Sequence, residues 1–173
     1  WRRNQGQDQI ILDYEKAIHP EMEQRLGFVR THRMRPGHST LFPNMSWLAG
    51  PRPVRLWHPR GPFHTEVWAF WAIDREASEE VQKAYRRNGM QSFGPSGLSE
   101  QDDMDNWRGS TEAGKSYIAR KYLSHIAMGI GHEWEHPDLP GRAIPKAFGE
   151  VNQRRMYQRW QQFMNANSWS EIP

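Results

Sequence analysis

Residues 66–74, with the sequence EVWAFWAID, are the most informative segment for the fold class of this chain. A period of two places Val67 and Trp71 on one face and Trp68 on the other, which is the pattern of a β-strand. Because both faces are apolar, we expect a central strand that is covered on both sides. Residues 54–58 (VRLWH) precede it across a Pro-Arg-Gly-Pro segment, so the two segments predict an antiparallel hairpin.

Similar patterns extend on either side of this hairpin. Residues 39–48 (STLFPNMSWL) are β-prone, but Pro43 should interrupt a central strand or place it at a sheet edge. Downstream, Asp74 is a candidate helix N-cap, and Asn88-Gly89 is a candidate stop for that helix.

Further helices follow from capping residues and apolar periodicity. Ser99 and Asp102 form a capping-box-like start for a helix toward Lys121, which internal glycines weaken. We also expect a short helix over 20–28 and a C-terminal helix over 148–164. Strands followed by helices predict an α+β layered fold.

The composition limits the functions available to this chain. Its 173 residues fit one domain, and no linker is evident. The 23 basic and 20 acidic residues are interspersed, so we expect no nucleic-acid interface. No apolar run is long enough for a membrane span. The absence of cysteine excludes disulfides, thiolate zinc sites and cysteine-held clusters within the chain.

Two segments are candidates for metal chemistry. His132-Glu133-Trp134-Glu135-His136 matches the H-E-x-x-H pattern of zinc hydrolases, although the glycines before it and Pro137 after it disfavour the required helix; the alternative is a surface loop with incidental histidines. Four acids lie within residues 100–105, where they could simply favour a helix N-terminus. Helical spacing places Asp103 on one face with Asn106 and Trp107, so Asp103 is the acid expected to turn inward and bind a metal.

Five blocks of sequence, taken in order, resemble one protein family. They are STLFPNMSW (39–47), VRLWHPRG (54–61), TEVWAFWAID (65–74), SFGPSGLSEQDDMDNW (92–107) and a C-terminal YxxW with NSWSE. The chain resembles the large (α) subunit of Rieske-type aromatic-ring-hydroxylating dioxygenases, which include the naphthalene and biphenyl dioxygenases. The resemblance covers most of the chain from Gly37 to the end.

This resemblance implies a helix-grip (Bet v 1-like) fold, in which an antiparallel sheet packs on helices, and a mononuclear Fe(II) held by two His and one Asp. It assigns the carboxylate ligand to Asp103. It also places His38, Leu48, Phe93, Leu98 and Ser99 at substrate-binding positions, with a roomier pocket at Ser99 than in many relatives.

Two features of the family are missing from this chain. The family's D-x-x-H-x4–5-H iron-ligand segment is absent, since 13–19 has the wrong spacing and only one His. The Rieske [2Fe-2S] cluster needs cysteines. The chain also begins at Trp1 without Met, so we expect residues 1–173 to be the C-terminal part of the catalytic domain, inactive as an isolated fragment.

For the intact protein, the resemblance implies a cytoplasmic oxidoreductase that converts an aromatic hydrocarbon, polycyclic ones included, to a cis-dihydrodiol. Dioxygen is the second substrate, and electrons come from NAD(P)H through a ferredoxin. The expected partners are a small β subunit and further α subunits in an α3β3 assembly. Two alternatives stay open: a metal-free helix-grip protein that binds an apolar ligand, and a zinc hydrolase using His132 and His136.

Overall fold

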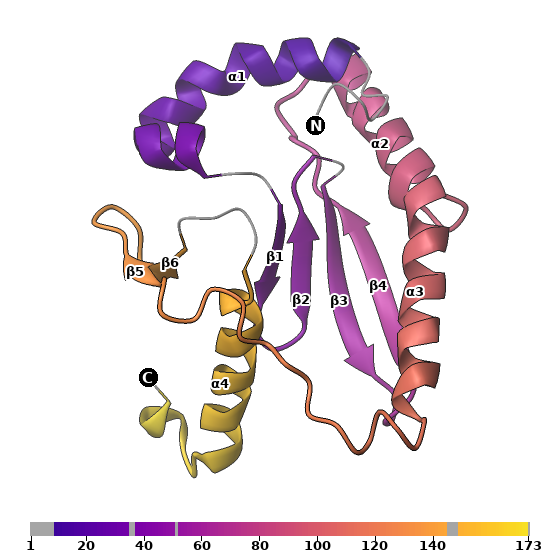
Figure 1. The fold of residues 1–173 in the computed structure, drawn as a ribbon. Coiled ribbons are helices and arrows are strands. Elements are labelled where there is room, and N and C mark those ends of the chain that lie inside the picture. Colours follow the sequence, from indigo (N-terminus) through magenta and orange to yellow (C-terminus); the bar gives the residue numbers. More distant parts are fainter. Residues whose placement is uncertain (1–8, 35–36, 51, 145–148, 173) are drawn as a thin grey trace. The chain divides into compact units, whose positions relative to one another are not determined.

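The computed structural model describes residues 9–34, 37–50, 52–144 and 149–172. The chain forms two compact units, Trp1–Ser116 and Tyr117–Pro173, a division that the sequence pattern did not indicate. The first unit contains the sheet and the helices that carry the predicted site residues (Figure 1).

The first helix, α1 (Gln9–Phe28), is longer than the predicted helix over 20–28. Pro20 lies inside α1 rather than at its start. A proline in a helix removes one backbone hydrogen bond, and packing of the N-terminal half offsets that cost. Ile11 is only 1% exposed and belongs to a core cluster with residues of the helix that follows the sheet.

An antiparallel sheet forms the centre of the first unit, with its strands in sequence order. The strands are β1 (His38–Leu41), β2 (Met45–Leu48), β3 (Pro53–Pro59) and β4 (Thr65–Trp71). Pro43 lies between β1 and β2, where the predicted interruption occurs. The predicted hairpin of β3 and β4 is confirmed, with Arg55 opposite Ala69 and Trp57 opposite Val67.

The expectation that residues 66–74 form a central strand is wrong for the described residues. In that part of the chain β4 is an edge strand, and Trp68 and Phe70 are each 51% exposed. The strand also ends at Trp71 rather than Asp74. Alternation reveals which faces are apolar, but it does not say how many strands lie alongside.

The helix α2 (Glu79–Phe93) begins later and ends later than predicted. Its N-cap is Ser78, whose hydroxyl accepts a hydrogen bond from the Val81 N–H. Asp74 instead accepts hydrogen bonds from the Tyr14 hydroxyl and the Glu76 N–H in the preceding turn. The helix continues through Asn88-Gly89 because these residues are buried and tertiary packing outweighs the weak helix propensity of glycine.

The helix α3 (Leu98–Gly114) follows α2, with Gly97 rather than Ser99 at its N-cap, and ends before the predicted limit near Lys121. Contacts from Trp57 to Trp107 place α3 against one face of the sheet. The first unit is therefore an antiparallel sheet with helices on one face, and the predicted α+β class is confirmed.

The second unit contains a short hairpin and a helix. Its elements are β5 (Trp134–Glu135), β6 (Arg142–Ala143), α4 (Val151–Asn165) and the 3-10 turn η3 (Trp169–Glu171). The predicted C-terminal helix is confirmed over most of its length, whereas Phe148 lies outside the described residues. On α4, Trp160 is 54% exposed.

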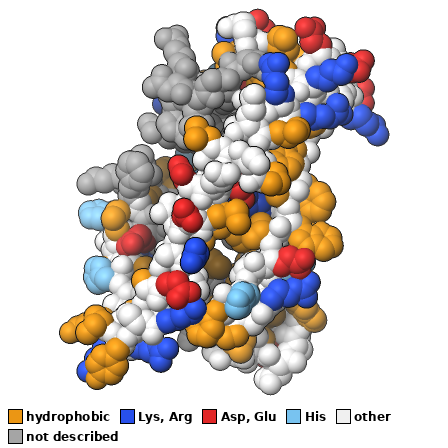
Figure 2. Space-filling model, turned by 90° about the vertical axis from the view of Figure 1, so that its right-hand side faces the viewer, with side chains coloured by type: hydrophobic (Ala, Val, Ile, Leu, Met, Phe, Trp, Pro, Cys, Tyr) orange, Lys and Arg blue, Asp and Glu red, His pale blue; other side chains and the backbone are white. Residues whose placement is uncertain are grey.

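Surface charge agrees with the composition. In the face drawn in Figure 2, side chains of both signs are interspersed. Among the described residues, the helices are all too short or too polar to cross a membrane.

Candidate functional site

The sheet itself positions two of the predicted site residues, His38 at the start of β1 and Leu48 at the end of β2. His38 pairs directly with Leu48 across β1 and β2. Because side chains alternate along a strand, the pairing places both on the sheet face that carries Arg55. The helices cover this face, which we call the inner face of the sheet. Leu48 is 6% exposed, whereas His38 is exposed at the start of β1.

The side of α3 that faces the sheet carries Glu100, Asp103 and Trp107. Glu100 is buried and the other two are half-buried, as their three- and four-residue spacing requires. The Trp107 ring meets the Trp57 ring edge-on at 5.1 Å between centroids. The predicted inward face is confirmed for Asp103 and Trp107.

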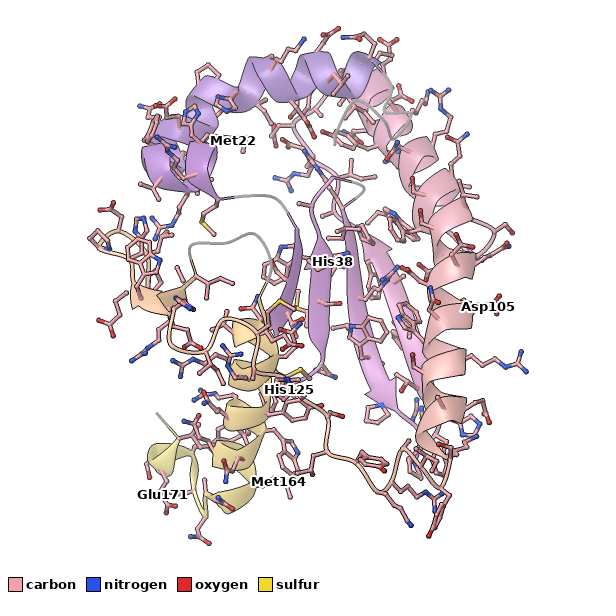
Figure 3. The ribbon with its side chains drawn as sticks, in the orientation of Figure 1. Met22, His38, Asp105, His125, Met164 and Glu171 are labelled. Carbon is pink, nitrogen blue, oxygen red and sulfur yellow. The ribbon has the colours of Figure 1, made fainter. Side chains whose placement is uncertain are left out.

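The other acids of this helix face solvent. Asp102 and Asp105 are exposed, and Figure 3 shows Asp105 on the outer side of α3. The expectation that Asn106 shares the inward face is wrong, since Asn106 is also exposed. The sheet contacts only a narrow stripe of the helix, and Asn106 lies just beyond it. Asp103 is therefore the only half-buried member of the acids at positions 102, 103 and 105.

A buried ion pair that sequence reasoning missed lies beside Asp103. Arg55 of β3 is 5% exposed, and its Nη2 donates a hydrogen bond to Glu100, which is 8% exposed. Burial raises the pKa of the Glu100 carboxyl, the nearby Arg55 charge opposes that shift, and the charge of Asp103 adds to it. The available signal was the charge of Arg55 on a strand face where its neighbours, Pro53 and Trp57, are apolar.

Aromatic rings surround the Arg55 guanidinium. Its central carbon lies 5.1 Å from the centroid of Phe93, 5.4 Å from that of Trp107 and 5.8 Å from that of Trp57. Such contacts stabilise a cation that has left water. Arg55 thus connects the end of α2, the inner side of α3 and the sheet around the position of Asp103.

The remaining predicted pocket residues differ in burial. Phe93 is half-buried at the C-terminus of α2 and contacts Arg55. Ser99 is half-buried in the first turn of α3. Leu98, by contrast, is 80% exposed in the described structure, so its predicted contact with a substrate stays a prediction.

The Asp103 carboxylate meets the requirements for one metal ligand. No described residue donates a hydrogen bond or forms an ion pair with it, although it is half-buried. Carboxylate and imidazole groups suit ferrous iron. Within the described ranges, however, no histidine joins Asp103 in a group of three metal-ligating side chains. Asp103 therefore fits as a single ligand, and the other ligands of such a centre must come from elsewhere.

The H-E-x-x-H segment does not have the geometry of a zinc hydrolase. Its middle residues form β5 instead of a helix, so His132 and His136 do not lie on one helical face. Glu133 forms an ion pair with Arg154 at 2.5 Å, and this hydrogen bond lowers the pKa of Glu133. His136 Nδ1 accepts a hydrogen bond from the Asp138 N–H. The geometric premise of the zinc hydrolase hypothesis is therefore wrong.

Together these features define an α+β domain with helices on one face of the sheet and with the inward carboxylate of Asp103 on α3. Residues 7–166 match the family model described as ring hydroxylating alpha subunit (catalytic domain). The chain belongs to this family, and the resemblance identified from the sequence is confirmed.

Individual relatives agree with this assignment. The chain is 37% identical over 153 residues to the biphenyl dioxygenase subunit alpha of Paraburkholderia xenovorans (strain LB400), covering 87% of this chain and 33% of that subunit. It is 35% identical over 151 residues to the biphenyl 2,3-dioxygenase subunit alpha of Rhodococcus jostii (strain RHA1), covering 86% of this chain and 33% of that subunit.

A solved structure of naphthalene 1,2-dioxygenase with indole bound in its active site superimposes with a TM-score of 0.81 at 27% identity. The match covers 92% of this chain and 36% of that one. The chain therefore spans about a third of the length of the relatives it matches.

Proposed function

We propose that this chain is part of the catalytic domain of a terminal oxygenase α subunit, and that the intact protein dihydroxylates an aromatic ring to a cis-dihydrodiol. Both atoms of dioxygen add across one ring bond, and electrons come from NAD(P)H through a ferredoxin. The family membership of the chain supports this assignment.

The observation that carries the proposal is the position of Asp103. Its carboxylate is half-buried on the inward side of α3 and has no partner among the described residues. We assign it as the carboxylate ligand of a mononuclear Fe(II), which two histidines outside the described residues complete. Bound ferrous iron would supply oxygen activation at its open coordination positions.

The residues around Asp103 would hold it in place and keep water away. Glu100 lies one helical turn before Asp103, and its pairing with Arg55 fixes that turn of α3 against β3. One turn of α3 after Asp103, the edge-on contact of Trp107 with Trp57 packs the helix against the sheet. A metal ligand depends on such surrounding contacts for its orientation.

Substrate would bind on the same side of the sheet. The pairing of His38 with Leu48 offers an apolar wall beside a polar side chain that can donate a hydrogen bond. Phe93 presents an aromatic face from the end of α2, and Ser99 leaves space at the start of α3. Together with Leu98, these residues form the proposed binding site for an aromatic hydrocarbon.

The remaining assignments concern the whole protein. We propose a Rieske [2Fe-2S] cluster in a domain outside this chain, a small β subunit, an α3β3 assembly and a cytoplasmic location. The family membership of the chain is their support.

The test replaces Asp103 in the full-length α subunit. Asp103→Ala should lose mononuclear iron and turnover but keep the visible absorbance of the Rieske cluster. Asp102→Ala is the matched control, because Asp102 is adjacent in sequence but exposed, and it should keep both. Metal analysis and product analysis on the same preparations provide the readout.

Two results would contradict the proposal. If Asp103→Ala retained iron and turnover, the ligand assignment would be wrong. If the wild-type protein bound an aromatic ligand but contained no mononuclear iron after anaerobic preparation, the metal-free binding protein would be the better description.

A further inference from the structure

A second group of metal-ligating side chains lies at the C-terminal end of α1. His19 and Glu23 are four residues apart, so they occupy the same side of the helix. The backbone reverses at Gly27, which has φ 78°, and continues into the short helix η2 (Val29–Arg33). This reversal brings His32 back against the two residues of α1.

The three side chains converge closely. His32 Nε2 lies 3.0 Å from Glu23 Oε2, and the centroids of the His19 and His32 rings are 4.9 Å apart. One ligand atom from each residue lies within 4.8 Å of the other two. With metal–ligand bonds of about 2.0–2.2 Å, ligand atoms around one ion stand roughly 3–3.5 Å apart, so small rotamer changes would close the site.

Neighbouring contacts hold His32 in this position. The Phe28 ring stacks on the His32 ring with 4.5 Å between centroids. Two of the nearby cations have other partners: Arg25 pairs with Glu21 at 2.7 Å, and Arg33 lies over the Phe28 ring at 5.7 Å. The cluster is therefore fixed by local structure, and these two positive charges are engaged outside it.

We propose that His19, Glu23 and His32 form a binding site for a borderline divalent cation of the Zn²⁺ class. Two imidazoles with one carboxylate favour zinc, cobalt, nickel or copper over magnesium or calcium, which prefer all-oxygen sites. Two of the three ligands come from α1, and the third comes from the returning turn η2. A bound ion would fasten this turn to α1 ahead of β1, whose first residue is His38.

This site is separate from the proposed Asp103 centre. Figure 3 shows Met22, in the turn of α1 between the two helical ligands, on the opposite side of the first unit from Asp105 of α3. The inference is therefore independent of the proposed oxygenase function, and either one can fail alone.

The test titrates the metal-free 173-residue chain with Zn²⁺ by calorimetry and with Co²⁺ by visible absorption. We expect one tight site with the absorption bands of nitrogen- and oxygen-bound cobalt. His32→Ala and Glu23→Gln should each weaken binding by at least about tenfold. Zn²⁺ should raise the melting temperature of the wild type but not of these variants.

Two control variants address other sources of binding. His64→Ala removes an exposed histidine elsewhere in the same unit, and Asp103→Ala removes the proposed iron ligand; both should bind Zn²⁺ like the wild type. Far-ultraviolet circular dichroism checks that each variant is folded. If His32→Ala does not fold, Glu23→Gln, which keeps the shape of the side chain, provides the test.

The proposal is wrong if the His32 and Glu23 variants bind as tightly as the wild type. It is also wrong if binding is spread over several weak sites that His64→Ala reduces equally, or if Asp103→Ala abolishes it.

Discussion

Arg55 of β3 and Glu100 of α3 form a buried ion pair one helical turn before Asp103. Burial raises the pKa of Glu100, and the Arg55 charge opposes that shift. Removing Arg55 would therefore leave the Glu100 carboxylate buried without a compensating positive charge. We therefore expect Arg55→Met to lower the free energy of unfolding by about 3–5 kcal/mol, measured by urea unfolding.

The double variant Arg55→Met, Glu100→Met is the informative comparison. Replacing both partners of a buried pair with apolar groups is often neutral or stabilising, so this variant should recover most of the loss. If it were as unstable as Arg55→Met alone, the pair would not be the cause. Arg60 and Glu66 form an exposed pair, and Arg60→Met should change the stability little.

Gly89 of α2 packs directly against the indole of Trp71. A Cβ atom at position 89 would overlap Cδ1 and Nε1 of Trp71, so Gly89→Ala should lower the free energy of unfolding by about 1–3 kcal/mol. Gly109→Ala in α3 is the matched control, because a Cβ there has no neighbour within 4 Å. It should stabilise the protein by about 0.5–1 kcal/mol, and a similar effect of both variants would contradict the packing explanation.

The hydrogen bond from the Tyr14 hydroxyl to Asp74 joins α1 to the turn after β4 at 2.6 Å. It lowers the pKa of Asp74 below 3.8 and raises the pKa of Tyr14 to about 12. A carboxyl group whose pKa is lower in the folded state stabilises the fold at any pH above its pKa in the unfolded state. This contribution is lost as the pH falls through the pKa of the folded state.

Tyr14→Phe should therefore be less stable than the wild type near neutral pH, and the difference should shrink as the pH falls below 3.8. Urea unfolding midpoints over a pH series test this expectation. If the difference in stability between Tyr14→Phe and the wild type stayed constant down to the lowest pH of the series, Asp74 would not be involved.

Leu48 and Leu98 are both predicted substrate contacts, but only Leu48 is buried. Leu48→Ala should lower the free energy of unfolding by about 2–5 kcal/mol through loss of packing. Leu98 is 80% exposed, so Leu98→Ala should leave the unfolding midpoint nearly unchanged. Equal losses in the two variants would mean that Leu98 packs against protein in solution.

Local pattern was sufficient for much of the candidate site. Helical spacing singled out Asp103 from its neighbouring acids, and the burial along α3 agrees. Alternation predicted the hairpin of β3 and β4. These inferences succeed because side-chain direction follows from the period of the backbone, which acts over a few residues.

Local pattern failed where distant residues determine the outcome. Gly89 was expected to end α2, but the close approach of Trp71 requires a glycine within the helix. Asp74 was expected to cap that helix, but it accepts a hydrogen bond from Tyr14, 60 residues earlier. In both cases the competing contact lies far away along the chain.

The residue types and their spacing establish the α+β class, the family and the inward carboxylate at Asp103. Three-dimensional packing alone establishes that Arg55 neutralises Glu100 beside it, and that His32 returns to His19 and Glu23. The physical reason is range: backbone periodicity is local, whereas charge pairing and ligand convergence depend on which distant segments the folded chain brings together.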